Sequence, residues 1–176
     1  MKTREELLTL ISSNTIGAEI GVFEGTFSKL ILETVNPQKF YLVDLFTGSM
    51  VSGDKNGHNM KTISLDESYN YLTNHYKQDS RVEIYKGKSE DFFNTISNNY
   101  LDFIYIDGDH SYEGAKIDLQ NAFHKVKNGG LICGHDYTPR FQGVMDAVNE
   151  FVSHHNFELK TTTQDECASF YIVNKK

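Results

Sequence analysis

Two short segments of this chain each bring acidic residues and histidines close together. Asp107, Asp109 and His110 lie in the first segment, and His135 and Asp136 in the second. Each follows an apolar run that predicts a buried strand. Because neighbouring strands of a sheet lie about 5 Å apart, we expect the two segments to meet at one edge. Two carboxylates beside imidazole suit a divalent cation: oxygen ligands favour magnesium or manganese, and imidazole favours manganese, iron or zinc.

The same residues also have structural interpretations. Asp109 and Ser111 are typical caps of the helix that follows them. His135 is also consistent with a neutral, hydrogen-bonded histidine that holds the next loop. Asp107 and Asp136 are therefore the stronger candidate ligands.

A glycine turn follows the first predicted strand. Gly21 and Gly25 are separated by three residues, and Glu19 stands two residues before Gly21. The turn lacks the G-x-G-x-x-G fingerprint of dinucleotide sites, and a carboxylate suits a cationic ligand group better than a diphosphate. Asp44 ends the second strand, where an acid can accept hydrogen bonds from both ribose hydroxyls. An ordinary turn and a strand-end cap are the alternatives.

Strands alternate with helices along the chain, which predicts an α/β fold with a mostly parallel sheet covered on both faces. Ligands bind such sheets at the carboxyl ends of the strands. The glycine pair 129–130 is expected to end the helix predicted at Ser111–Val126. Strands are predicted at Gly17–Val22, Phe40–Asp44, Val82–Tyr85, Asp102–Asp107, Leu131–Gly134, Phe157–Thr161 and Ala168–Val173, the last two antiparallel. Helices are predicted at Arg4–Ile11, Thr26–Glu33, from the capping box of Ser64 and Glu67 onward, at Ser111–Val126 and at Phe141–Val152.

Residues Thr47–Lys61 have no periodicity and are rich in glycine, serine, asparagine and charge, so they predict a loop. A loop of this length is a lid, a binding loop or a disordered insertion, and the sequence leaves these open. The remaining histidines are expected on loops or solvent-exposed faces: His58, His75, His124, His154 and His155.

Composition narrows the class of protein. The 176 residues suit one domain, 1–176, and the net charge of -7 without a basic stripe argues against a nucleic-acid partner. No apolar run is long enough to span a membrane, and Met1–Ile11 does not resemble a signal peptide. Cys133 and Cys167 do not form a disulfide framework. We therefore expect a cytoplasmic protein that acts on a small molecule; whether it forms a homo-oligomer stays open.

Several motifs point to one enzyme family. The pattern E-x-G-x-x-x-G, followed by a strand that ends in Asp44, resembles motifs I and II of class I S-adenosylmethionine-dependent methyltransferases. The segments Ile106–Glu113 and Gly129–Tyr137 resemble a small bacterial family that includes macrolide-sugar and cephalosporin-pathway O-methyltransferases. The similarity runs from Gly17 onward and is strongest in these segments. It implies a Rossmann-like methyltransferase fold with a seven-stranded sheet and an antiparallel last strand.

The resemblance also implies a cofactor site for S-adenosylmethionine. Glu19 would hold the ammonium group, the two glycines would make room for the methionine part, and Asp44 would bind the ribose. Ser89 and Glu90 would lie beside the adenine, although Ser89 is also a typical cap for a helix starting at Glu90. The implied set is Glu19, Gly21, Phe23, Gly25, Asp44, Ser89, Glu90 and Asp107.

In the macrolide-sugar relatives, the metal ligands match Asp107, His135 and Asp136, and the base matches His110. This sequence departs from them at His135, where the relatives carry an acid. A magnesium or manganese ion would lower the pKa of an acceptor hydroxyl, and His110 titrates near neutrality, as a base should. The rim residues Tyr112, Tyr137 and Arg140 are candidate acceptor contacts, although Tyr112 is also expected in the core.

The sequence thus predicts metal-assisted O-methylation of a small acceptor such as a sugar, a glycoside or a catechol-like ring. Three alternatives remain. A nicotinamide-dependent oxidoreductase would need the missing third glycine. A cofactor-binding protein without catalysis would not need His110. A metal-dependent phosphoesterase would leave Glu19 and Asp44 without a role.

Overall fold

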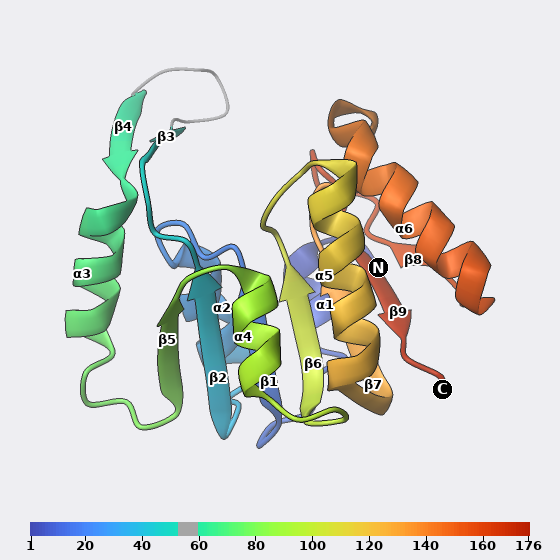
Figure 1. Ribbon diagram of the computed structural model, residues 1–176, viewed down its shortest axis with the longest axis horizontal. Helices are drawn as coiled ribbons and strands as arrows, with labels where there is room; N and C mark the ends of the chain where they lie inside the picture. Colours follow the sequence, from blue (N-terminus) through green and yellow to red (C-terminus); the bar gives the residue numbers. More distant parts are fainter. Residues whose placement is uncertain (53–59) are drawn as a thin grey trace.

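The computed structural model describes residues 1–52 and 60–176, which form a seven-stranded sheet in the order β5-β2-β1-β6-β7-β9-β8 (Figure 1). The neighbours from β5 to β7 are parallel, and β9 is antiparallel to both β7 and β8. The predicted α/β fold with an antiparallel last strand is therefore confirmed. The strands are β1 (Ile16–Ile20), β2 (Lys39–Asp44), β5 (Val82–Lys86), β6 (Leu101–Ile106), β7 (Val126–Gly134), β8 (Lys160–Thr161) and β9 (Phe170–Val173).

Alternating side chains of the strands supply two apolar cores, one on each face of the sheet. In β6, Ile104 faces the core shared with α4, α5 and α6, whereas Phe103 faces the core shared with α1, α2 and α3. Both side chains are at most 1% exposed, as expected for a sheet covered on both sides (Figure 1). The helices are α1 (Arg4–Leu8), α2 (Thr26–Thr34), α3 (Leu65–His75), α4 (Ser89–Thr95), α5 (Tyr112–Lys125), the 3₁₀ turn η1 (Pro139–Phe141) and α6 (Gln142–His155).

The strand order reverses between β1 and β6, and the loops at that point are tied together by backbone hydrogen bonds. The amide of Asp107 donates to the carbonyl of Ile20 at 2.7 Å, and the amide of His135 donates to that of Ile106 at 3.0 Å. These bonds continue the parallel pairing past the strand ends. The residues after β1, β6 and β7 are thereby held side by side, where an open α/β sheet binds its ligand.

The structure corrects the predicted end of the helix before β7. α5 ends at Lys125, and β7 begins at Val126, which has extended backbone dihedrals. The two glycines instead lie in an irregular part of β7, where its register against β6 shifts between Leu101 and Phe103. Gly129 has a φ of 83°, and a Cβ on Gly130 would lie 2.5 Å from the carbonyl oxygen of Asp102. The glycines therefore serve a bulge and not a helix cap.

The structure also corrects the loop predicted at Thr47–Lys61, because strands form at its two ends. β3 (Ser49–Ser52) pairs antiparallel with β4 (Lys61–Ser64), and this two-stranded sheet stands beyond the carboxyl end of β2 (Figure 1). β-Branched residues such as Val51 and Ile63 favour this pairing. Residues 53–59, with His58, lie outside the described residues. Ser64 caps α3 as predicted, accepting a hydrogen bond from the amide of Glu67.

Within residues 1–52 and 60–176, the helices are all too short or too polar to cross a membrane.

Candidate active site

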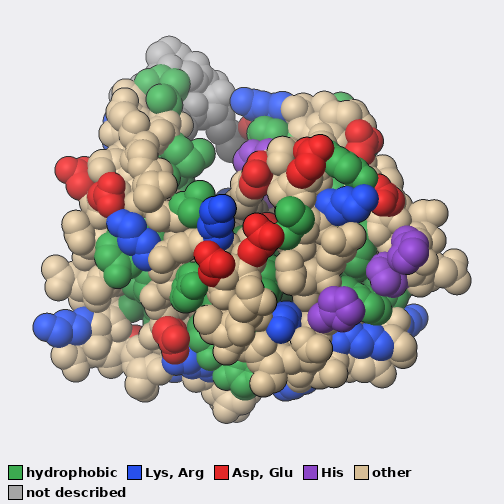
Figure 2. Space-filling view, viewed as in Figure 1, with side chains coloured by type: hydrophobic (Ala, Val, Ile, Leu, Met, Phe, Trp, Pro, Cys, Tyr) green, Lys and Arg blue, Asp and Glu red, His purple; other side chains and the backbone are tan. Residues whose placement is uncertain are grey.

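A cavity of about 900 Å³ lies at the carboxyl ends of the strands. The surface is hollowed there, between the side of the molecule that carries the β3–β4 hairpin and the side that carries α5 and α6 (Figure 2). Its wall contains all of the residues predicted for the cofactor, the metal and the base except Gly25: Glu19, Gly21, Phe23, Asp44, Ser89, Glu90, Asp107, His110, His135 and Asp136. The topology thus brings together residues that are more than 100 positions apart in the sequence.

The glycine turn is shaped by close backbone contact. Gly21 has a φ of 86°, and a Cβ at this position would lie 2.0 Å from the carbonyl oxygen of Asp107. Only glycine fits a position that needs both a left-handed conformation and this approach. Gly25 is instead the N-cap of α2, and a Cβ there would lie 2.4 Å from the side chain of Leu72. Its role is to start the helix and to admit α3.

Asp44 holds the turn in place. Its Oδ2 accepts hydrogen bonds from the amides of Val22 and Phe23 at 2.8 and 3.0 Å, and its Oδ1 accepts one from Phe46 at 2.7 Å. A carboxylate offers about four lone-pair sites, so one remains for a ligand in the cavity. Asp44 is therefore a strand-end cap that also lines the cavity.

Glu19 is a buried carboxyl group that lines the cavity. It is 2% exposed and accepts a short hydrogen bond from the hydroxyl of Ser28. Burial, with the negative charges of Asp107 and Asp44 nearby, raises the pKa of Glu19 to about 8. A cationic ligand group would offset this repulsion. Sequence analysis missed Ser28; the only signal was a small polar residue next to Phe27 on the inward side of a helix.

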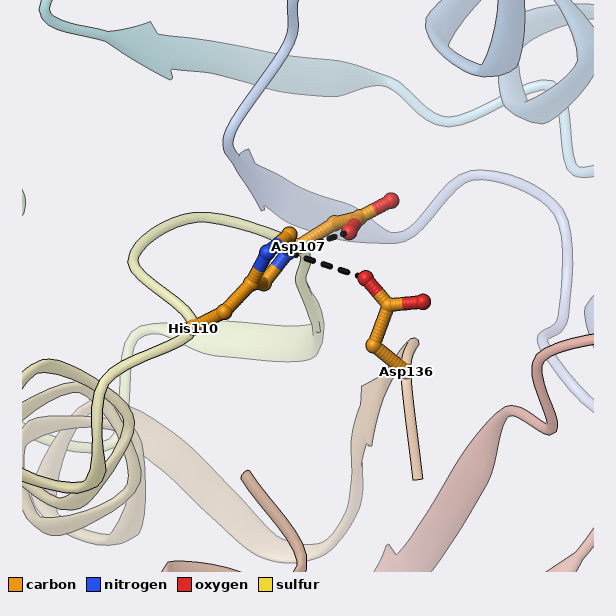
Figure 3. A group of neighbouring side chains, drawn as sticks. All are labelled: Asp107, His110 and Asp136. Carbon is orange, nitrogen blue, oxygen red and sulfur yellow. Dashed lines mark ion pairs between the residues drawn. The ribbon is translucent and has the colours of Figure 1, made fainter. Parts of the chain in front are cut away.

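Asp107, His110 and Asp136 converge at the ends of β6 and β7 (Figure 3). Nε2 of His110 lies 2.9 Å from Oδ2 of Asp136 and 3.6 Å from Oδ1 of Asp107. His135 lies beside them, with its Nδ1 3.1 Å from Oδ1 of Asp136 and 3.7 Å from Oδ2 of Asp107. The two acids and two histidines predicted to meet at one edge therefore do so.

The carboxylates alter the proton affinities of both histidines. Asp107 and Asp136 together raise the pKa of His110 to about 10. Burial acts to lower the pKa of His135, but the same two carboxylates outweigh it and raise that pKa. Burial likewise acts to raise the pKa of Asp136, and the two histidines outweigh it and lower the pKa well below its usual range. The cluster is thus strongly coupled by charge.

These residues fit a divalent cation. One ligand atom from each of Asp107, His110 and Asp136 lies within 4.8 Å of the others. Nε2 of His110 is buried and, although close to both carboxylates, is not aligned for a hydrogen bond with any described residue. An imidazole nitrogen and two carboxylates are a donor set that manganese, iron or zinc accepts. His110 occupies the place in this triad that the resemblance assigned to His135.

The high pKa of His110 makes the stability of the metal-free protein depend on pH. A pKa raised from 6.5 to about 10 on folding stabilises the native state fully below pH 6.5. This stabilisation is lost as pH rises through 10. In EDTA, we expect the unfolding free energy of the wild type, relative to His110→Gln, to fall between pH 6 and pH 10. Urea denaturation at several pH values measures it, and a difference that does not change with pH would refute the ion pair.

The far end of the cavity is built by α4 and α5. Ser89 is the first residue of α4, and its hydroxyl donates to Oδ1 of Asp118 at 2.6 Å. It therefore does not cap the helix, whose N-cap is Lys88. Asp118 lines the same wall and was missed by sequence analysis, which treated α5 only as a packing helix.

Other rim residues have mainly structural roles. Asp109 accepts from the amide of Ser111, and Ser111 caps α5, so the capping interpretation is confirmed. The hydroxyl of Tyr112 bonds Glu150, and that of Tyr137 bonds Asn149 at 2.8 Å. Arg140 does line the cavity, together with Arg4 and Phe141, which the sequence did not indicate.

A family profile described as a methyltransferase domain matches residues 18–137, and the chain belongs to this family. No curated protein matches the chain in sequence. Together the family and the fold confirm the predicted class, that of the class I S-adenosylmethionine-dependent methyltransferases.

Solved structures share the fold at low sequence identity. The precorrin-6y C5,15-methyltransferase of Geobacter metallireducens has a TM-score of 0.66 at 8% identity, over 96% of this chain and 85% of that one. Aeropyrum pernix fibrillarin, with natively bound S-adenosylmethionine, has a TM-score of 0.63 at 15% identity, over 92% and 67%. An O-methyltransferase family protein of Burkholderia thailandensis has a TM-score of 0.65 at 10% identity, over 98% and 55%.

Proposed function

We propose that this protein methylates a hydroxyl group of a small acceptor, with S-adenosylmethionine as methyl donor and a divalent cation as an aid. One observation carries the proposal: a single cavity joins the glycine turn and Asp44 to the cluster of Asp107, His110 and Asp136. The structural neighbours include a carbon methyltransferase and an O-methyltransferase family protein. The acid–histidine cluster favours oxygen, because hydroxyl groups need activation and orientation by a base or a cation.

S-adenosylmethionine supplies an electrophilic methyl group. The residues around it would bind and orient the cofactor. The buried carboxyl group of Glu19 would accept the ammonium group, since a positive charge there offsets the repulsion from Asp107 and Asp44. Gly21 and Phe23 would contact the methionine part across the turn. Asp44 would use its remaining lone pair to accept a hydrogen bond from the ribose, and Ser89 and Glu90 would contact the adenine ring.

A bound magnesium or manganese ion would supply positive charge that lowers the pKa of the acceptor hydroxyl. Asp107, His135 and Asp136 would hold it. Its charge would also offset the two carboxylates that raise the pKa of His110, so that His110 would be neutral and would take the acceptor's proton. The structure adds an alternative in which His110 completes the ligand triad. When His110 is protonated, Asp107 and Asp136 orient its imidazole, because both carboxylates face the same ring nitrogen.

Calorimetric titration of S-adenosylhomocysteine into the purified protein tests the cofactor assignment, with NAD as the comparison ligand. We expect micromolar binding of S-adenosylhomocysteine and none of NAD. A folded sample that binds NAD, or that binds neither compound, would contradict the proposed function. Hydroxylated acceptors are then screened with and without added manganese, and we expect turnover to depend on the ion.

A further inference from the structure

Asp118 is a buried carboxylate with an unusual setting. It is 3% exposed, yet it lines the cavity, on the side formed by α4 and α5. Its Oδ1 accepts the hydroxyl proton of Ser89 at 2.6 Å. Among the described residues, we find neither a cation paired with Asp118 nor a hydrogen-bond donor to its Oδ2. A Cβ added to Gly108 would lie 3.7 Å from that oxygen. Buried carboxylates normally find such partners.

The bond to Asp118 determines what Ser89 can offer to a ligand. A serine hydroxyl has one proton and two lone pairs. Because the proton points to Asp118, Ser89 presents only lone pairs to the cavity. The carboxylate of Asp118 also offers only lone pairs when ionised. Burial raises its pKa to about 6, so it remains mostly ionised at pH 7.5. The side chains of Ser89 and Asp118 can therefore accept hydrogen bonds from a ligand in the cavity but can donate none to it.

The position of this wall indicates which part of the cofactor it meets. The methyl group must face the acceptor, and the acid–histidine cluster that would activate the acceptor lies at the ends of β6 and β7. The base is at the opposite end of the nucleoside from the reacting sulfur. Gly87 at the end of β5 donates its amide to the carbonyl of Asp44 at 2.9 Å, so the wall of Ser89 and Asp118 begins next to the candidate ribose site.

We propose, on the basis of the proposed cofactor, that Asp118 is a positioning residue that makes the cavity selective for a 6-aminopurine. Because Asp118 accepts the hydroxyl proton of Ser89, both side chains offer only hydrogen-bond acceptors to the cavity. The exocyclic amino group of adenine has the N–H donors that match them. A 6-ketopurine has a carbonyl oxygen in place of the amino group. This oxygen would face the lone pairs of Ser89 and Asp118 and would find no hydrogen-bond donor there. A buried unpaired group of this kind lowers affinity by roughly tenfold to a hundredfold.

The experiment compares the affinities of S-adenosylhomocysteine and its deaminated 6-keto analogue, S-inosylhomocysteine, by calorimetry at pH 7.5. We expect the wild type to prefer the amino compound by roughly tenfold to a hundredfold. In Asp118→Asn, the new amide brings N–H donors to the wall, so we expect the preference to fall to within about threefold. Asp91→Asn, which removes a charge from the exposed side of α4, should keep the wild-type ratio.

The ratio separates the proposal from its alternatives. If Asp118 only supports the fold, both affinities fall in parallel and the ratio stays, which would overturn the inference. Ser89→Ala is a second variant that removes the hydroxyl itself, and it should also narrow the ratio. If the wild type binds neither compound, the proposed function fails. If it binds both equally well, only the selectivity inference fails.

Discussion

Replacing Gly21 with alanine is expected to abolish binding of S-adenosylhomocysteine and to destabilise the fold by roughly 3 kcal/mol or more. Alanine would have to adopt a φ of 86°, which costs roughly 1–2 kcal/mol. Its Cβ would also lie 2.0 Å from the carbonyl oxygen of Asp107 and 2.7 Å from the amide nitrogen of Gly108. Both contacted atoms belong to the backbone of the loop after β6, which is hydrogen-bonded to Ile20. Relieving the clash therefore requires this loop to move away from the cofactor site.

Gly129→Ala is the matched control for this variant. Gly129 has a similar φ of 83°, but an added Cβ would meet no described atom within 4 Å. It should cost only the conformational penalty, about 1–2 kcal/mol, and leave cofactor binding intact. Urea denaturation and calorimetry of both variants measure the difference. Equal losses of stability would show that the contact with Asp107 is relieved easily, and that conformation alone requires glycine.

Asp136→Asn is expected to weaken manganese binding by about a hundredfold or more, since even residues that only support metal ligands contribute roughly ten- to a hundredfold. Asparagine is the suitable replacement because Asp136 has a φ of 58°, and asparagine tolerates this left-handed conformation. The change removes the charge and keeps the shape. Calorimetry or electron paramagnetic resonance with manganese alone measures the affinity.

Asp109→Asn is the control for the loss of one negative charge near the cluster. Asp109 bonds the amide of Ser111 through one oxygen, and an amide oxygen can keep that bond, so manganese affinity should change little. Equal manganese affinity in the wild type and Asp136→Asn would eliminate the metal site. Absence of binding in the wild type would eliminate it as well.

Two histidine variants complete the manganese test. If His110 is the base and His135 a ligand, His110→Gln keeps the affinity and His135→Gln loses it. If the triad of Asp107, His110 and Asp136 holds the ion, the opposite pattern follows. Both histidines contact the same carboxylates, so loss in both variants would indicate that each ligates.

The sequence by itself determined the sheet, its layers and the place of the site. Apolar runs end at Ile20, Val43 and Ile106, and the residues that follow them, Gly21, Asp44 and Asp107, line the cavity. This worked because parallel strands place their carboxyl ends at one edge. The prediction needed only local pattern and chain order.

The tertiary structure alone decided the contacts made between separate elements. Glu19 is paired with Ser28, and Ser89 with Asp118, which lies 29 residues further along the chain. These pairs have no local sequence signature. Whether Ser28 or Asp118 reaches its partner depends on how its helix packs against the sheet. The same holds for the glycine pair 129–130. Glycine is required at Gly130 because a Cβ there would clash with the carbonyl oxygen of Asp102 on another strand. Side chains brought together by packing depend on distances that a one-dimensional pattern does not contain.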